Sequence, residues 1–490
     1  MNHTHDNHYD LTALARQEMI DEGFVPDFPV EAERQAAALR THPAQPAASG
    51  DVRDLSGLLW SSIDNDTSRD LDQIEVAERL PDGAIRIRVA IADVDSGVPK
   101  GSPIDEHAAA NCTTVYTGVK NFSMLPDDLS TDLTSLNEHA DRLSMVVELT
   151  VAADGSVQDG VAYHAVTRNA AQLAYSSVGP WLEGLAAAPP KVAASAELQE
   201  QLRLQDQAAQ KLRETRHRSG ALDLDRVESE AVISDGHVTG IQPRPRNRAS
   251  QLIEDFMIAA NGVIARLLHD RHVPSIRRVV KTPERWDRIV ELAARAGGHL
   301  PADPDSGALN QFLIERRAQD PLHYADLSLA VVKLMGPGEY VLERPGDVQI
   351  GHFALAVHDY THSTAPNRRF ADLVTQRLVK AAVAGQDSPY ADAELDGVAR
   401  HCTEREDAAR KVERAMSKRI AAVAMHDRIG ETFPGVVTGV TPKGTFVRLV
   451  SPPVEGRMMR GEHGLDVGDQ VRVKLLNTDP VRGFIDFGRG

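Results

Sequence analysis

Residues 63–73 read Ile-Asp-Asn-Asp-Thr-Ser-Arg-Asp-Leu-Asp-Gln, and a strand pattern follows them at once. Four carboxylates fall within nine residues of this loop: Asp64, Asp66, Asp70 and Asp72. So much negative charge in one short loop destabilises a folded chain unless a cation neutralises it. Hard oxygen ligands favour magnesium, manganese or calcium. The loop therefore predicts a metal site, and the alternative is an acidic loop that only faces solvent.

The same loop also has the ligand spacing of an EF-hand, which makes an EF-hand-like calcium-binding protein a remote alternative. The ligand positions would fall on Asp64, Asp66, Ser68, Asp70, Asp72 and Glu75. Arg69, however, stands where the sharp turn of an EF-hand requires glycine. The segment at 74–83, IEVAERLPDG, alternates and turns like a β-hairpin, whereas an EF-hand continues as a helix.

The chain around the loop divides into three parts. Residues 1–50 contain two helical patterns, 11–22 and 30–40, and end in a linker-like THPAQPAASG. They are typical of a docking segment or of a helix-turn-helix relative. Residues 51–430 have strand patterns early and helical patterns late, which predicts an α+β domain. Residues 431–490 contain short β-rich runs between Gly and Pro turns, which predict a five-stranded OB-fold barrel.

The composition is that of a folded globular protein with an acidic balance. The 490 residues are 42% hydrophobic and 26% charged, with 54 Lys and Arg against 71 Asp and Glu, a net charge of −17. Residues 433–490 carry eight basic against six acidic side chains, so the remaining chain has 46 against 65. Basic side chains are therefore expected to bind nucleic-acid phosphates only in a locally basic region such as the barrel.

Cysteine usage and the N-terminal sequence indicate the cellular compartment. Cys112 and Cys402 are too few for a disulfide framework and are expected to be buried in a reducing environment. The first ten residues, MNHTHDNHYD, have no basic region or apolar core of a signal peptide, and no run approaches ~18 apolar residues. We expect a cytoplasmic protein without membrane contact. His3, His5 and His8 could bind a metal but are more typical of a solvated tail.

Several motifs, taken together, resemble the RNB (ribonuclease II) family. They are DNDTSRDLDQ at 64–73, VAIADV at 89–94, SMLPDDLS at 123–130, TSLN at 134–137, GALDLD at 220–225, SQLIEDFMIAAN at 250–261 and YTHSTAPNRRFADLVTQRLVKA at 360–381. They occur in the family's order, and the terminal barrel is similar to the family's OB-fold RNA-binding domain. The resemblance implies a processive, hydrolytic 3′–5′ exoribonuclease. Such an enzyme threads the 3′ end of single-stranded RNA into the RNB domain and releases nucleoside 5′-monophosphates; we expect a monomer.

The resemblance assigns the metal ligands to Asp64, Asp70 and Asp72, holding one or two Mg²⁺ or Mn²⁺ ions. Metal-bound carboxylates lower the pKa of an attacking water and neutralise phosphodiester oxygens. The family often has a fourth aspartate directly after the third, and this chain has Gln73 there, which brings no charge and cannot act as a base. Asp66 could compensate, or could simply face solvent. Gln73 keeps open the alternative of a catalytically silent RNA-binding regulator on the same scaffold.

Arginines of the 360–381 motif are the candidate phosphate ligands. By resemblance, Arg368 acts with Asp72 in catalysis and stabilises charge in the transition state, because a guanidinium can bridge two phosphate oxygens. Arg369 and Arg377 are secondary candidates for phosphate contacts.

Other side chains are assigned to RNA by the same resemblance. Tyr116 should meet the terminal nucleotide, and Tyr175 and Glu254 should contact ribose hydroxyls. Glu413 matches a glutamate near the scissile end. For each of them the alternative is a core tyrosine or a surface glutamate.

Two positions bear on base stacking. In the barrel, Phe446 and Arg448 are two residues apart on the TFVRLV strand and so share a face, the pattern of a stacking and phosphate-binding strand. The alternative is that Phe446 belongs to the barrel core. Leu224 stands where the family's GALDFD-like motif has a phenylalanine that stacks on a base. Leucine has no aromatic face, so either the terminal nucleotides are bound less tightly or Leu224 packs in the hydrophobic core.

Overall fold

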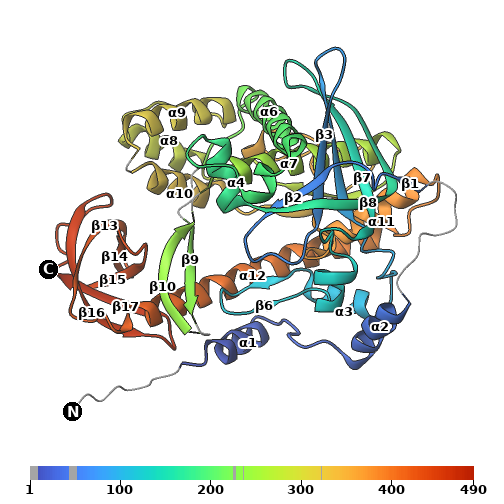
Figure 1. The fold of residues 1–490 in the computed structure, drawn as a ribbon. Coiled ribbons are helices and arrows are strands. Elements are labelled where there is room, and N and C mark those ends of the chain that lie inside the picture. The colour runs from blue at the N-terminus through green and yellow to red at the C-terminus, as the bar shows by residue number, and fades with distance from the viewer. Residues whose placement is uncertain (1–8, 43–51, 225–227, 235–236, 245, 322) are drawn as a thin grey trace.

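A six-stranded sheet with the strand order β1-β8-β2-β3-β4-β7 lies in the upper right of the computed structural model as drawn in Figure 1. Its strands are β1 (Arg53–Asp54), β2 (Trp60–Asp64), β3 (Gln73–Arg79), β4 (Ile85–Ala92), β7 (Asp141–Val151) and β8 (Val157–Ala174). The long strand β8 pairs with β7 through its first part and with β2 through residues 169–174, so the pairings form a closed ring. The carboxylate loop connects β2 to β3 at one end of this sheet.

The structure describes residues 9–42, 52–224, 228–234, 237–244, 246–321 and 323–490. Predictions for His3, His5, His8, most of the 41–50 linker and the final Asp225 of the GALDLD motif fall outside these ranges.

The hairpin predicted after the carboxylate loop is confirmed. Strands β3 and β4 pair antiparallel from Gln73 opposite Ile91 to Arg79 opposite Ile85, and Gly83 donates its backbone N–H to the carbonyl of Leu80 in the turn. The EF-hand alternative is therefore wrong, because a strand and not a helix leaves the loop.

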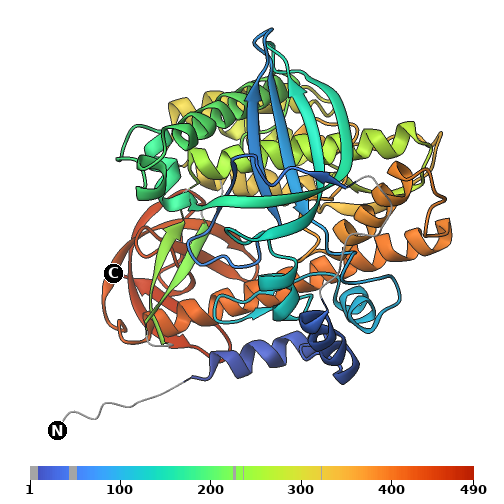
Figure 2. The ribbon, with the colours of Figure 1, turned by 45° about the vertical axis from the view of Figure 1, so that its right-hand side comes forward.

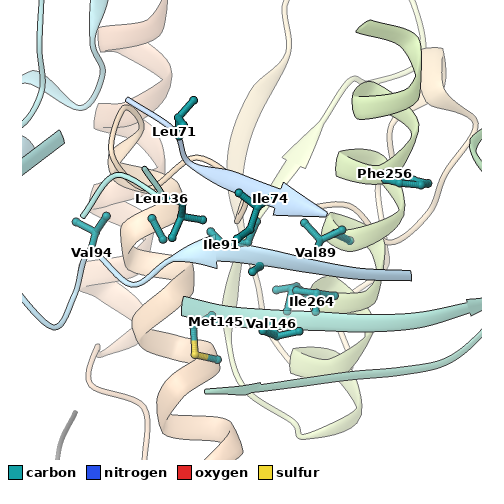
Figure 3. Packing of buried hydrophobic residues seen from close by; sticks show 14 of the residues in the cluster. Leu71, Ile74, Val89, Ile91, Val94, Leu136, Met145, Val146, Phe256 and Ile264 are labelled. Carbon is teal, nitrogen blue, oxygen red and sulfur yellow. The ribbon is translucent and has the colours of Figure 1, made fainter. Parts of the chain in front are cut away.

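Helices α6 (Ala196–Arg218) and α7 (Arg248–Asp270) pack against the sheet and against each other. Asn247 caps α7 by accepting the backbone N–H of Ser250. Apolar side chains of α7, Phe256 and Ile264 among them, join those of β3, β4 and β7 in the main core (Figure 3). This mixture of layers confirms the α+β class.

The remaining elements surround this core. The helices are α1 (Leu11–Asp21), α2 (Val30–Thr41), α3 (Pro103–Asn111), α4 (Tyr175–Leu182), α5 (Pro190–Ala193), α8 (Trp286–Arg295), α9 (Ser306–Gln319), α10 (Tyr324–Met335), α11 (Phe370–Val383) and α12 (Asp392–His426), with a π-helix at Leu129–Leu133 and a 3-10 turn at Phe353–Leu355. Short strand pairs are β5 (Val115–Tyr116) with β6 (Asn121–Phe122), β9 (Glu228–Ser234) with β10 (His237–Arg244), and β11 (Ser275–Val279) with β12 (Glu339–Glu343).

The two N-terminal helices form as predicted, and α1 docks on α12. Asp10 caps α1, which buries Ala15 and Met19 in a cluster with Val412 and Met416 of α12. This contact is the docking arrangement that the sequence left open beside a helix-turn-helix. Figure 2 shows α1 alongside α12.

The C-terminal region is the predicted five-stranded closed barrel, in the order β13-β14-β15-β17-β16. Its strands are β13 (Thr432–Thr441), β14 (Gly444–Leu449), β15 (Glu455–Arg460), β16 (Gln470–Asp479) and β17 (Phe484–Arg489). Val447 and Phe487 fill its interior, and Met425 from the end of α12 belongs to the same cluster. The long helix α12 thus joins the barrel to the α+β region (Figure 1).

Helices α8, α9 and α10 enclose a separate apolar cluster against which Leu224 packs. The neighbouring Asp223 is bound to Arg317 of α9 at 2.7 Å, and its carbonyl accepts the hydroxyl of Tyr324 of α10. These contacts favour core filling as the role of Leu224.

Candidate active site

The carboxylate loop is shaped by its own hydrogen bonds and by the TSLN motif beneath it. Asp64, the last residue of β2, accepts the backbone N–H of Asn65 at 2.7 Å and the hydroxyl of Ser68 at 3.0 Å. Ser135 accepts the N–H of Leu71 at 2.9 Å and donates to the carbonyl of Arg69 at 2.7 Å. Two motifs that are separate in the sequence therefore form one support for the loop.

Asp72 and Arg368, predicted to act together, are in contact. Asp72 is 2% exposed; its Oδ1 accepts the backbone N–H of Asn367 at 2.9 Å and its Oδ2 accepts Nε of Arg368 at 3.2 Å. Burial raises the pKa of Asp72 to about 7, although the charge of Arg368 opposes the rise. The Arg368 side chain remains 42% exposed, so its free guanidinium edge is open to a substrate.

Tyr116 links the loop to helix α12. Its hydroxyl lies 3.5 Å from Oδ2 of Asp70, and its backbone N–H donates to Oε1 of Glu413 at 3.2 Å. Burial raises the pKa of Asp70, to which the nearby charge of Asp64 adds, and burial also raises the pKa of Glu413. With Tyr116 itself 40% exposed, the structure places a ring on the open side of the carboxylates.

The carboxylates fit a divalent cation that is shared with a substrate. Within the described ranges, no three His, Cys, Asp or Glu side chains are arranged as a complete metal cage. Asp64, Asp70 and Asp72 nevertheless lie close enough for each negative charge to influence the next, and the only donor atoms they offer are oxygens. Mg²⁺ is commonly held by one or two carboxylates together with substrate phosphates, and this loop supplies carboxylates of that kind.

The two residues considered as compensation for the missing aspartate have different environments. Asp66 is exposed, and its Oδ1 accepts the hydroxyl of Ser176 in α4 at 2.7 Å. This bond ties the loop to α4, and the exposure of Asp66 agrees with the alternative of a side chain that faces solvent. Gln73 is 8% exposed at the first position of β3.

Tyr175 and Glu254 lie on two helices that meet. Tyr175 begins α4 half-buried, and Nδ2 of Asn247, the cap of α7, donates to its carbonyl at 2.8 Å. Glu254 follows on α7 with its side chain 43% exposed and paired with Arg246. Glu254 is thus at the surface, whereas Tyr175 also packs against the core.

The secondary arginines are engaged inside the protein. Arg369 donates through Nε and Nη2 to Asp372 at 2.8 and 2.7 Å. Arg377 is 4% exposed and donates to Asp95 and to the hydroxyl of Tyr390, each at 2.7 Å. The prediction of a phosphate contact is wrong for Arg377, because its buried guanidinium is already bonded to internal partners.

On strand β14, Phe446 and Arg448 share the outward face as predicted. Thr445, Val447 and Leu449 alternate with them and are buried, so assigning Phe446 to the barrel core is wrong. Nη2 of Arg448 lies 2.9 Å from Oδ1 of Asp326 in α10. Arg448 therefore joins the barrel to the helical cluster, and binding a phosphate would require it to leave Asp326.

Asn367 is the site residue that the sequence reasoning missed. Besides its backbone bond to Asp72, its side-chain Oδ1 accepts the hydroxyl of Thr134 at 2.6 Å. The available signal was its position directly before Arg368 in a matched motif.

A carboxylate loop with one buried aspartate in contact with an arginine, a partly exposed tyrosine beside it and a small β-barrel on the same chain suit a site for phosphodiester hydrolysis. Residues 52–385 match the RNB domain family, and residues 431–490 match the RNase II-type exonuclease C-terminal S1 domain. The chain belongs to the RNB family of exoribonucleases.

Individual relatives agree with this assignment. The chain is 31% identical to ribonuclease R of Thermotoga maritima over 94% of its own length and 68% of that protein. It is 32% identical to exoribonuclease 2 of Escherichia fergusonii, covering 81% of this chain and 61% of the relative. The chain therefore spans about two thirds or less of the length of these relatives.

Solved structures share the fold. Mycoplasma genitalium RNase R in complex with ribose-methylated single-stranded RNA matches with a TM-score of 0.86 at 22% identity, over 98% of this chain and 78% of that one. Yeast Ssd1, described as a pseudonuclease, matches with a TM-score of 0.70 at 16% identity, over 95% of this chain and 57% of that one.

Proposed function

We propose that this chain is a processive hydrolytic 3′–5′ exoribonuclease that degrades single-stranded RNA to nucleoside 5′-monophosphates. The observation that carries the proposal is the contact of Asp72 with Arg368 beside the carboxylates of the β2–β3 loop. The names of the relatives, ribonuclease R and exoribonuclease 2, support the same activity.

The carboxylates and Arg368 of the site have separate roles in this proposal. Asp64, Asp70 and Asp72 would hold one or two Mg²⁺ or Mn²⁺ ions. Such ions, when bound, would lower the pKa of the attacking water and neutralise the charge of the phosphate oxygens. Arg368 uses its exposed edge to bind the non-bridging oxygens of the scissile phosphate, whose charge grows in the transition state. Asp72 holds Arg368 in place through Nε, and the backbone of Asn367 fixes Asp72.

The RNA is proposed to enter with its 3′ end toward this site. Tyr116 would stack on the terminal nucleotide, Tyr175 and Glu254 would contact ribose hydroxyls, and Glu413 would hold Tyr116 through its backbone. Phe446 and the exposed arginines of the barrel would bind the strand upstream. We further propose that the protein acts as a monomer in the cytoplasm and divides into units at 1–50, 51–430 and 431–490. No helix in the described part of the chain is long and apolar enough to cross a membrane.

A test uses 5′-labelled poly(A) with Mg²⁺. We expect a ladder that shortens from the 3′ end, together with released 5′-AMP. An intact substrate in the presence of tight RNA binding would contradict the proposal.

That result would favour a second candidate, a catalytically silent RNA-binding regulator. Gln73 is the observation that supports it, because it removes one charge from the loop, and a pseudonuclease with the same fold exists. The retained Asp64, Asp70, Asp72 and Arg368 favour the enzyme.

A further inference from the structure

Four oxygen atoms behind the carboxylate loop have no hydrogen-bond partner among the described residues. They are Oγ of Ser61, Oε1 and Oε2 of Glu75, and Oε1 of Gln205. All three residues are completely buried. Buried polar groups are almost always paired, so a group of unpaired oxygens at one place requires an explanation.

These residues lie where helix α6 packs on strand β3, beside the position at which β2 pairs with β3. Ser61 stands directly opposite Glu75 in the antiparallel register, and side chains at such positions share a face about 5 Å apart. Nε2 of Gln205 donates to the backbone carbonyl of Glu75 at 3.4 Å, which brings this amide to the same residue. Gln73 lies two positions earlier on β3 and therefore on the same face as Glu75.

Glu75 differs from every other buried carboxylate in the described ranges. Asp72, Asp93, Asp105, Asp206, Asp255 and Asp372 are also buried, and each has an arginine or lysine within ion-pair distance. Glu75 has no such partner in the described part of the chain. The charged group that acts on it is Asp64, which is negative and adds to burial in raising the pKa of Glu75 well above its usual range. Among the residues that the structure describes, each buried acid thus has a cationic side chain beside it except Glu75, which follows the carboxylate loop.

We propose that Ser61, Glu75 and Gln205 form an interior binding site for a hard divalent cation, Mg²⁺ or Mn²⁺. The donor atoms are all oxygens, which is the set that these ions prefer, and the ion is the positive partner that Glu75 lacks. Gln73 shares its face of β3 with Glu75, so the site adds positive charge and a carboxylate next to the position where Gln73 brings no charge. It is distinct from the ligand set Asp64, Asp70 and Asp72, and its existence does not depend on the proposed nuclease activity.

The experiment counts bound metal without RNA. Metal-free full-length protein is titrated with MnCl₂ at pH 7.5, and free Mn²⁺ is measured by its electron paramagnetic resonance signal. We expect Glu75→Gln, which preserves side-chain shape, to bind one equivalent fewer than the unchanged protein or to bind it at least tenfold more weakly. Glu78→Gln removes the same charge from an exposed position on the same strand and should bind as the unchanged protein does.

A second variant and a second readout keep the test decisive. Ser61→Ala should weaken the same equivalent, and Mn²⁺ should raise the melting temperature of Glu75→Gln less than that of Glu78→Gln. Equal Mn²⁺ stoichiometry and affinity in Glu75→Gln and Glu78→Gln would overturn the proposal, and Glu75 would then be a neutral acid bonded to interior water. If Glu75→Gln fails to fold, unchanged binding by Ser61→Ala leads to the same conclusion.

Discussion

Asp72 and Arg368 are 296 positions apart in the sequence and meet at 3.2 Å in the structure. The Asp72 carboxylate is buried and held in place, whereas the Arg368 guanidinium is partly exposed. Arg368 is therefore the member of the pair that can reach a substrate. This asymmetry suits a site in which the carboxylate sets geometry and the arginine contacts phosphate.

The first prediction concerns Asp72→Asn. The substitution keeps the shape of the side chain and removes its charge, so we expect RNA binding to persist while turnover falls by orders of magnitude, because transition-state charge loses its support. Filter binding and single-turnover cleavage of labelled poly(A) measure the two properties. Near-native turnover would show that the loop has been assigned wrongly.

A second prediction at the same scale concerns His352, which caps a 3-10 turn with its ring. Its Nδ1 accepts the N–H of Leu355 at 3.2 Å, and burial, reinforced by the charge of Arg278, lowers its pKa to about 4. Since the folded-state pKa lies below the unfolded value of about 6.5, the stability from neutral His352 is complete above pH 6.5. It is lost as the pH falls from there toward 4.

His352→Asn should keep the capping acceptor and remove this titration. Between pH 7 and 5 the unchanged protein should lose at most about 2 kcal/mol more unfolding free energy than the variant does. Urea unfolding at both pH values gives the comparison. Equal losses in the two proteins would mean that His352 is protonated without cost.

Among the elements, α12 connects the N-terminal helix, the candidate site and the barrel. This 35-residue helix packs on α1, holds Tyr116 through Glu413, and ends with Met425 in the barrel core. The turn between β16 and β17 rests on it, because a Cβ added at Gly483 would lie 2.8 Å from Cβ of Lys418.

The third prediction compares two glycines of the barrel. Gly483 and Gly468 both have positive φ, +70° and +97°, but a Cβ at Gly468 would meet nothing within 4 Å. Gly483→Ala should therefore destabilise the protein by about 1–3 kcal/mol more than Gly468→Ala, since it adds a clash with α12 to the same backbone strain. Thermal unfolding measures the difference. Equal melting temperatures would show that the barrel does not rest on α12 in solution.

Over the whole molecule, charge is distributed unevenly. The chain has a net charge of −17, yet residues 433–490 contain eight Lys and Arg side chains against six Asp and Glu. Exposed arginines such as Arg457, which stands opposite Phe446 in the barrel register, give the acidic protein a local surface for phosphates.

The fourth prediction follows from this distribution. Arg457→Ala should weaken binding of long single-stranded RNA similarly for all sequences and reduce the slope of log affinity against log salt by about 1. Arg295→Ala removes an equally positive, 78% exposed side chain from α8 and should change neither quantity. Fluorescence anisotropy over a salt series distinguishes the two. An unchanged slope for Arg457→Ala would exclude this face of the barrel from the RNA path.

Much of the fold was predictable from the sequence because local patterns specify it. The hairpin after the carboxylate loop, the helices at 11–22 and 30–40 and the barrel all follow from alternation, capping residues and turn signals within about a dozen neighbouring positions. The core of the candidate site was predictable as well, since Asp70, Asp72 and Arg368 lie in motifs that resemble one family, and the same resemblance assigned Tyr116 and Glu413 outside those motifs.

Only the tertiary structure decided which polar side chains are already occupied. Arg377 is buried with Asp95, Arg448 is bound to Asp326, and Asp66 is bonded to Ser176. Glu75 alternates along its strand like any other residue and becomes unusual only because no cation faces it in the described structure. The physical reason is that alternation and capping act between neighbours in the chain, whereas an ion pair is formed between groups that packing brings together from distant elements.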